Sequence, residues 1–94
     1  MIRGFQDKKI RLFAEGERVK QFQSFRKQAE KRFRILEAAQ ELHDLARLHS
    51  NHLETLSGKR KGQYSIRIND QWRIYFTWQG DAEGPENVEM IDYH

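Results

Sequence analysis

The spacing of apolar residues changes from helical to strand-like near residue 63, and this change restricts the folds open to the chain. Before it, the apolar residues recur at steps of three and four: Phe25, Ala29, Phe33, Leu36, Ala39 and Leu42. That spacing places one apolar stripe on a helix with about 3.6 residues per turn. We expect this helix to start at a Ser24 N-cap, or earlier near Arg18, and to be basic in its first half.

After residue 63 the period becomes two, which is typical of strands. One face of the two predicted strands is apolar and carries Tyr64, Ile66, Ile68, Trp72, Ile74, Phe76 and Trp78. The sequence Asn69-Asp70-Gln71 between the runs predicts a hairpin turn. The apolar face should pack under the long helix, which leaves the face with Arg67, Arg73 and Tyr75 open to a ligand.

The remaining segments complete an α+β pattern. We expect an edge strand at Ile2–Phe5, a helix capped by Asp7 that runs to about Ala14, and a short strand between Leu53 and Leu56. A last strand at Val88–Ile91 follows a polar loop. The predicted architecture is two N-terminal helices packed on one face of a mostly antiparallel twisted sheet of about four to five strands. Residues 1–94 should form a single domain.

Composition and charge narrow the class of protein. The chain has 94 residues, no cysteine, and neither a signal peptide nor an apolar run of membrane-spanning length, so we expect a cytoplasmic protein without disulfides. Its net charge of +3 conceals blocks: residues 1–34 hold eleven Lys or Arg against four acids, and residues 74–94 hold five acids and no Lys or Arg. The basic blocks are either solvated surface or contacts for phosphate.

The residues near the hairpin and the C-terminus are suited to metal-free RNA cleavage. Such a reaction needs a base for the 2′-hydroxyl, an acid for the leaving oxygen and cations for the phosphate. The proton-transfer candidates are His52, Asp92, Tyr93 and His94; the cation candidates are Lys59, Arg60, Lys61, Arg67 and Arg73; Tyr75 and Tyr93 are candidates for stacking on bases. A frayed tail and a merely solubilising arginine face are the structural alternatives. Neither a metal nor another cofactor is expected, because the histidines lack ligand spacing.

Several segments together resemble the HigB-like toxins of the RelE/ParE superfamily of bacterial toxin–antitoxin modules. They are LETLSGKRKGQYSIRINDQWRIYFTW, the terminal VEMIDYH, the opening MIRGF and the helix with FRILEAAQELHDL. The resemblance covers essentially the whole chain. It implies ribosome-dependent cleavage of mRNA in the A site, neutralisation by a HigA-type helix-turn-helix antitoxin, and operator DNA contacted through that complex.

The resemblance also assigns roles to residues. It places the strand arginine at Arg73 and the terminal group at Asp92, Tyr93 and His94, and the turn cation at Lys59 or nearer Ser57. The histidine expected before the basic turn is replaced by Glu54. His52 lies two residues earlier, about 7 Å away along a strand, so His94 becomes the preferred acid or base.

Two other functions are compatible with this sequence. One is inhibition of DNA gyrase in the manner of ParE, because a shared scaffold does not determine function. The other is a non-catalytic basic module that binds nucleic acid. The terminal Asp-Tyr-His and the arginine on the hairpin favour the nuclease.

Overall fold

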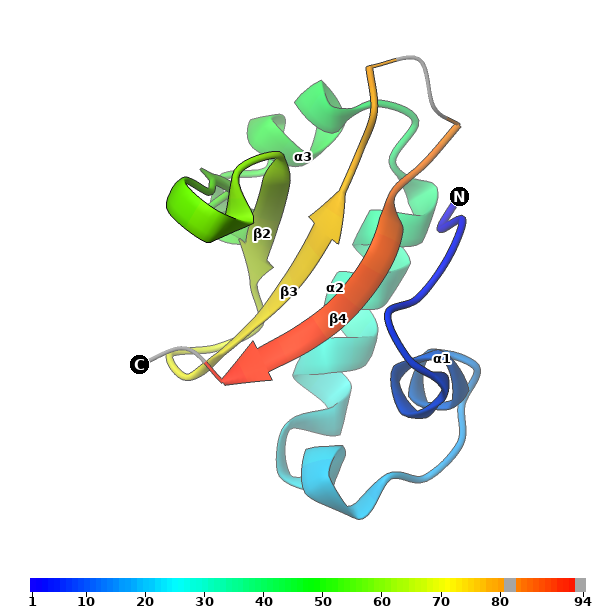
Figure 1. Cartoon of the computed structure of the whole chain (residues 1–94). Coiled ribbons are helices and arrows are strands. Elements are labelled where there is room, and N and C mark those ends of the chain that lie inside the picture. Colours follow the sequence, from blue (N-terminus) through cyan, green and yellow to red (C-terminus); the bar gives the residue numbers. More distant parts are fainter. Residues whose placement is uncertain (81–82, 93–94) are drawn as a thin grey trace.

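In the part of the chain that the structure describes, residues 1–80 and 83–92, four strands form one antiparallel sheet (Figure 1). In this computed structural model the helices, with η for a 3-10 helix, and strands are α1 (Lys8–Ala14), η1 (Lys20–Phe25), α2 (Arg26–Ala38), α3 (Leu42–Arg47), η2 (His49–Asn51), β1 (Glu54–Thr55), η3 (Gly58–Arg60), β2 (Gln63–Arg67), β3 (Trp72–Thr77) and β4 (Glu86–Asp92). The strand order is β1-β2-β3-β4. The predicted α+β class is confirmed.

The β2–β3 hairpin forms where the period-two pattern predicts it. Ser65 lies opposite Tyr75, and Arg67 lies opposite Arg73. The turn is closed by Asn69, whose Oδ1 accepts hydrogen bonds of 2.8 Å from the backbone N–H groups of both Gln71 and Trp72. A side chain that satisfies two turn amides fixes the register of the strands that follow.

Helix α2 covers one face of the sheet and forms the core with it. Figure 1 shows α2 behind β3 and β4. The buried residues of this contact come from the helix stripe and from the apolar face of the strands: Ala29, Phe33, Leu36, Ile66, Ile74, Phe76 and Val88. Each large apolar side chain buried in this way stabilises the fold by about 1.5–3 kcal/mol.

The start of the helical layer follows the prediction at α1 and departs from it at α2. Asp7 caps α1, with its carboxylate accepting from the backbone N–H of Ile10 at 2.9 Å. The predicted Ser24 N-cap of the long helix is wrong, because Ser24 lies inside η1 and α2 begins at Arg26. The 3-10 turn buries Phe22 and Phe25, so core packing outweighs the local capping preference.

The long helix also ends earlier than its apolar stripe suggests. Ala39 has an extended backbone (ψ 134°), and Leu42 opens the separate helix α3. The break is stabilised by Asp44, whose Oδ2 accepts from the backbone N–H groups of Gln40 (2.9 Å) and Glu41 (3.2 Å). This capping box starts a third helix that was not predicted. No helix in the described ranges combines the length and apolar character needed to cross a membrane.

The N-terminal segment runs beside β4 and, within the described residues, forms one isolated bridge with it. Phe5 pairs in parallel with Val88, supported by hydrogen bonds from Gln6 N–H to the Val88 carbonyl (2.9 Å) and from Val88 N–H to the Gly4 carbonyl (3.1 Å). The predicted strand Ile2–Phe5 is therefore wrong in extent. At this point β4 is irregular, since Asn87 has a φ of 54°, and the ladder does not continue.

Candidate active site

Arg73 is buried on the face of the sheet opposite to α2, and oxygens from two segments orient it. Its Nε donates to the Ser65 hydroxyl at 2.8 Å, and its Nη2 donates to the backbone carbonyls of His52 (2.5 Å) and Ser65 (3.3 Å). Oε1 of Glu54 lies 4.0 Å from the same Nη2, at the outer limit of an ion pair. Three hydrogen bonds therefore orient the guanidinium, and the carboxylate of Glu54 lies at the outer limit of an ion pair with it.

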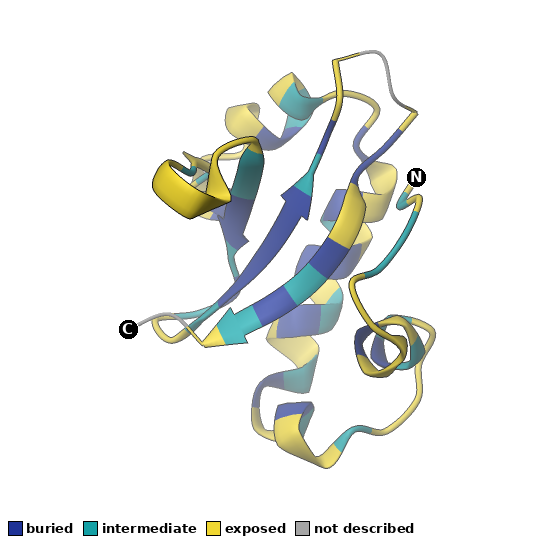
Figure 2. Cartoon of the chain, viewed as in Figure 1, coloured by how far each residue is buried: buried dark blue, intermediate teal, exposed yellow. Residues whose placement is uncertain are grey.

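The expectation that this face of the sheet is open is wrong for Arg73 and Tyr75. They are 5% and 6% exposed, and Figure 2 shows β3 buried along most of its length. The loop that follows η2 crosses here: the His52 carbonyl reaches Arg73, and β1 pairs with β2 through Glu54 and Ser65. The alternation of residues along a strand shows the face on which each side chain lies. Whether that face is covered depends on a segment far away in the chain, here the loop that follows η2.

A buried polar network connects this loop to α2. Arg32 of α2, 8% exposed, donates through Nη1 to the Asn51 side-chain oxygen at 2.9 Å and to the Ser50 hydroxyl at 3.2 Å. The fully buried Asn51 in turn donates to the Leu45 carbonyl at 3.1 Å. Burial, and after it the charge of Arg67, lowers the pKa of Arg32. The network fixes η2, and so fixes the loop that carries His52 and Glu54.

His52 contacts the candidate site through its backbone. It ends η2 in the left-handed region (φ 45°, ψ 54°), and its N–H bonds to the His49 carbonyl at 3.1 Å. Its exposed imidazole lies beside that of His49, with 5.6 Å between ring centroids. The described structure thus places the His52 carbonyl, not its ring, against Arg73.

The basic turn lies over Tyr75. Lys59, Arg60 and Lys61 are all exposed, and Cζ of Arg60 lies 4.8 Å from the centroid of the Tyr75 ring. Gln63 holds Arg60 there by accepting from its Nη1 at 3.0 Å. Tyr75 was expected to offer an exposed platform for a base, and this is wrong because the ring is buried with a guanidinium above it.

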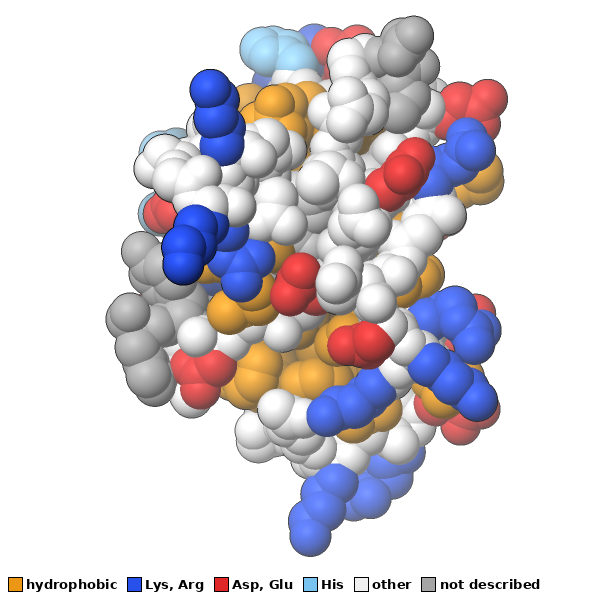
Figure 3. All heavy atoms as spheres, viewed as in Figure 1, with side chains coloured by type: hydrophobic (Ala, Val, Ile, Leu, Met, Phe, Trp, Pro, Cys, Tyr) orange, Lys and Arg blue, Asp and Glu red, His pale blue; other side chains and the backbone are white. Residues whose placement is uncertain are grey.

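Arg67 lies at the edge of the sheet, beyond the end of β1. Its Nη2 pairs with the carboxylate of Asp70 in the hairpin turn, and its side chain is 35% exposed. Figure 3 shows Lys and Arg side chains gathered over η3 on one side of this face and near α1 on the other, with Asp and Glu between them. The cations near Arg73 are thus separate from those of the N-terminal helices.

The three predicted terminal residues are only partly described. Asp92 lies opposite Trp72, while Ile91 lies opposite Arg73. Directly opposed residues share a face, so the Asp92 side chain leaves the strand on the side of α2. Its Oδ2 accepts from Gln71 Nε2 at 3.0 Å. The expected grouping of Asp92 with Arg73 is therefore not found, and Tyr93 and His94 lie outside the described residues.

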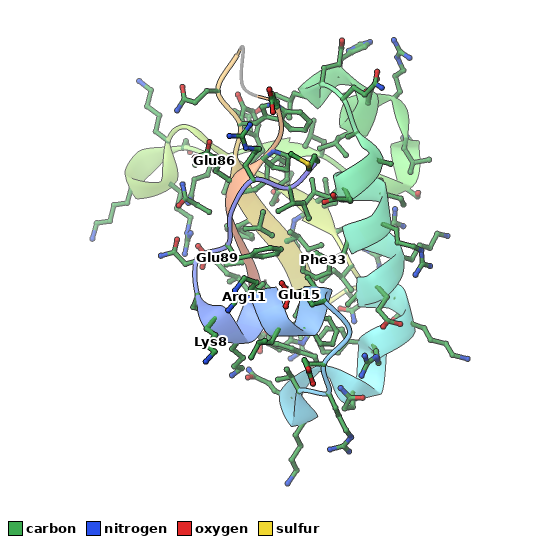
Figure 4. The ribbon with its side chains drawn as sticks, turned by 90° about the vertical axis from the view of Figure 1, so that its right-hand side faces the viewer. Lys8, Arg11, Glu15, Phe33, Glu86 and Glu89 are labelled. Atoms are coloured by element: carbon green, nitrogen blue, oxygen red, sulfur yellow. The ribbon has the colours of Figure 1, made fainter. Side chains whose placement is uncertain are left out.

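A separate groove lies on the helical side of the molecule. It has a volume of about 750 Å³ and is lined by α1, α2 and the N-terminal segment. Its walls are largely apolar, with Phe5, Phe13 and Phe33 among them, and Glu15 stands at its margin. Figure 4 shows Glu15 and Phe33 on this side. None of its lining residues belongs to the surroundings of Arg73.

The residues that position Arg73 were not among the predicted site residues. Ser65 looked like an ordinary polar strand residue, and Arg32 like one of several helix cations. The available signal was their spacing. Ser65 shares the strand face of Arg73, and Arg32 is adjacent to Phe33 of the apolar stripe. No described group of three or more His, Asp or Glu side chains is arranged to hold a metal.

Comparison with known proteins agrees with this architecture. The family described as "RelE-like toxin of type II toxin-antitoxin system HigB" matches residues 3–94. The chain is 36% identical over 76 residues to "Toxin HigB-1" of Vibrio cholerae serotype O1 (strain ATCC 39315 / El Tor Inaba N16961), covering 79% of this chain and 80% of that protein. A match over nearly the whole length, together with the helix-covered antiparallel sheet, shows that the chain belongs to the HigB-like toxins of type II toxin–antitoxin systems.

Proposed function

We propose that this toxin is a ribosome-dependent, metal-independent endoribonuclease that cleaves mRNA in the A site and arrests translation. The proposal rests on family membership and on one observation, the buried and multiply bonded guanidinium of Arg73. A cation that is already oriented stabilises the negative charge of a phosphorane without reorganising during the reaction.

The surroundings of Arg73 support this role. The oxygens of Ser65 and His52 are uncharged, so they orient the guanidinium without cancelling its charge. At low exposure its attraction for a phosphate is stronger than it would be in water. Because Arg73 is 5% exposed, a phosphate reaches it only when the loop that follows η2, which covers it, moves. Docking on the ribosome is the step that we expect to drive this movement.

Other residues have supporting roles in the proposal. His94 protonates the leaving 5′-oxygen, with Tyr93 assisting proton transfer. Asp92 takes part only after the end of β4 rearranges, because its side chain lies on the side of α2. Lys59, Arg60, Lys61 and Arg67 bind phosphates of mRNA and ribosomal RNA, as exposed cations around a nuclease site do. His52 and Tyr75 contact RNA only after the loop or the basic turn shifts, because Tyr75 is buried and the His52 ring lies beside His49.

As a type II toxin, the protein has an antitoxin partner. We infer that this partner is a HigA-type helix-turn-helix protein, and that the complex binds operator DNA. The toxin acts in the cytoplasm, where its ribosomal target is, and residues 1–94 function as one domain.

The decisive experiment maps mRNA 5′ ends by primer extension on ribosomes stalled at a defined codon. The wild-type toxin should cut within the A-site codon only when ribosomes are present. His94→Ala and Arg73→Lys should each slow the cleavage by at least about 100-fold, a typical loss for an acid or a charge-stabilising group. Arg11→Ala is the matched control, because Arg11 is an exposed arginine on α1 that pairs with Glu15.

A gyrase supercoiling assay is run beside the cleavage assay. Inhibition of gyrase without any cut mRNA would replace the nuclease with a ParE-like activity. Binding to ribosomes without either effect would indicate a non-catalytic module.

A further inference from the structure

The imidazoles of His49 and His52 lie side by side at the surface, one at each end of the η2 turn. Their ring centroids are 5.6 Å apart with 50° between the ring planes, and both residues are exposed. Residues three apart in a 3-10 turn lie above one another. This turn is closed by the hydrogen bond of 3.1 Å from the His52 N–H to the His49 carbonyl. The backbone therefore brings the two rings together.

This arrangement suits a divalent metal ion that prefers nitrogen ligands. With Zn–N bonds of about 2.0 Å and a tetrahedral angle, the ring centroids of two histidines on one zinc ion lie about 5 Å apart. The rings at 5.6 Å need only a small rotation to reach that geometry. Among the described residues, no hydrogen bond occupies a ring nitrogen of either histidine. Both rings therefore have a nitrogen to offer.

The two histidines select the kind of ion. No third His, Asp or Glu within the described ranges completes the site, so water fills the remaining coordination positions. Imidazole suits Zn²⁺, Cu²⁺ and Ni²⁺, whereas Mg²⁺ prefers oxygen ligands. We did not expect this pair from the sequence, because its spacing of three depends on a 3-10 turn that the residues alone did not reveal.

The pair belongs to the loop that covers Arg73. The His52 carbonyl accepts from Arg73 Nη2, and His52 holds that carbonyl in place with a left-handed backbone, at a φ of 45°. Few residues other than glycine adopt this conformation, so it depends on its surroundings. A metal ion that joins the two rings opposes rotation of the His52 backbone and keeps the carbonyl on Arg73.

Resting on the proposed function, we propose that His49 and His52 bind a zinc-like divalent cation that holds the toxin in its covered, inactive form. The ion binds the form in which the rings are paired. It shifts the equilibrium towards that form by the difference between its affinities for the covered and open forms. A phosphate then reaches Arg73 less often, because the loop must release the ion before it moves away.

The first measurement titrates ZnCl₂ into the complete toxin by isothermal calorimetry, without ribosomes. The affinity for zinc should fall at least about 10-fold in His49→Ala and in His52→Ala, since each variant lacks one of the two protein ligands. His43→Ala removes an exposed histidine of α3 and is the matched control, with an expected affinity equal to that of the wild type. Circular dichroism checks that each variant is folded. Absence of zinc binding, or an equal affinity in the wild type and both ligand variants, would overturn the site.

The second measurement follows single-turnover cleavage on ribosomes in Mg²⁺ buffer, with and without saturating ZnCl₂. Zinc should slow the wild type at least about 10-fold, because it lowers the fraction of open toxin, and should change the rate of His49→Ala less than about 3-fold. Zinc that binds the pair without slowing the wild type would disprove the inhibitory role, and so would equal slowing of both proteins. If the wild type cleaves no mRNA without zinc, the proposed function and the inhibition both fail, and calorimetry alone decides whether the zinc site exists.

Discussion

Arg73 on β3 donates a hydrogen bond to the backbone carbonyl of His52 at the end of η2, a residue 21 positions earlier in the chain. His52 presents that carbonyl because its backbone is in the left-handed region, with a φ of 45°. The same guanidinium bonds to Ser65 of β2. One side chain therefore joins a central strand, its neighbour and the covering loop, so the structural and chemical effects of removing it must be measured separately.

Replacing Arg73 should show this double role. Arg73→Ala removes the donor from the buried Ser65 hydroxyl and from two carbonyls, and hydrogen bonds that involve a charged group contribute about 1.5–3 kcal/mol. We expect a loss of about 2–3 kcal/mol in the free energy of unfolding, measured by urea denaturation. Arg73→Lys should keep more stability but not the activity, since lysine lacks the planar fork. Unchanged stability in Arg73→Ala would contradict the bonded geometry.

The network at Arg32 should determine the stability of the loop. Arg32→Ala leaves the buried side-chain oxygen of Asn51 without this donor, at an expected cost of about 1–3 kcal/mol. For a domain of this size each kcal/mol lowers the melting temperature by about 4–8 °C. Arg34→Ala, an exposed arginine on the same helix, is the control and should shift the melting temperature little. Equal shifts in the two variants would show that the network does not stabilise η2.

The contact between Arg60 and Tyr75 should be measurable although Arg60 is exposed. A cation–π contact at the surface contributes about 0.5–1 kcal/mol, so Arg60→Ala should lower the free energy of unfolding by that amount. Lys59→Ala removes an equal charge from the same turn and should have a smaller effect. Urea denaturation of both variants distinguishes the ring contact from a general loss of charge.

Asp44 should make stability depend on pH in acid. The backbone N–H of Gln40 has the largest effect and lowers the pKa of Asp44. Desolvation raises this pKa, whereas the backbone N–H of Glu41 and the charges of Arg47 and His43 lower it further. Because the folded pKa lies below the unfolded value of about 3.9, its stabilisation is complete above that pH and is lost as pH falls through the folded pKa. Melting temperatures should therefore show Asp44→Asn less stable than the wild type at neutral pH.

The same comparison in acid completes the test. The difference between the two proteins should shrink as the pH falls below about 4. A difference that stays constant down to about pH 3 would show that the carboxylate does not stabilise the start of α3 through its charge.

Parts of the fold could be predicted because they depend on neighbouring residues. The period of two through Ile66, Ile74 and Phe76, and the turn amides that Asn69 accepts, are local properties, and the hairpin follows from them. The end of α2 could not be predicted from its stripe. Leu42 continues the helical spacing, yet the capping box of Glu41 and Asp44 begins a new helix there. Competing local signals of similar strength leave such a boundary undetermined.

The sequence by itself determined which strand and which face carry Arg73, because alternation along a strand depends only on the neighbouring residues. Only the tertiary structure decided that this face is covered, that Ser65 and the His52 carbonyl orient the guanidinium, and that Glu54 stands beside it. The tertiary structure also placed the Asp92 side chain on the α2 side of the sheet, away from Arg73. The physical reason is that burial and the choice of hydrogen-bond partners arise from contacts between segments far apart in the chain, which no local pattern of residues records.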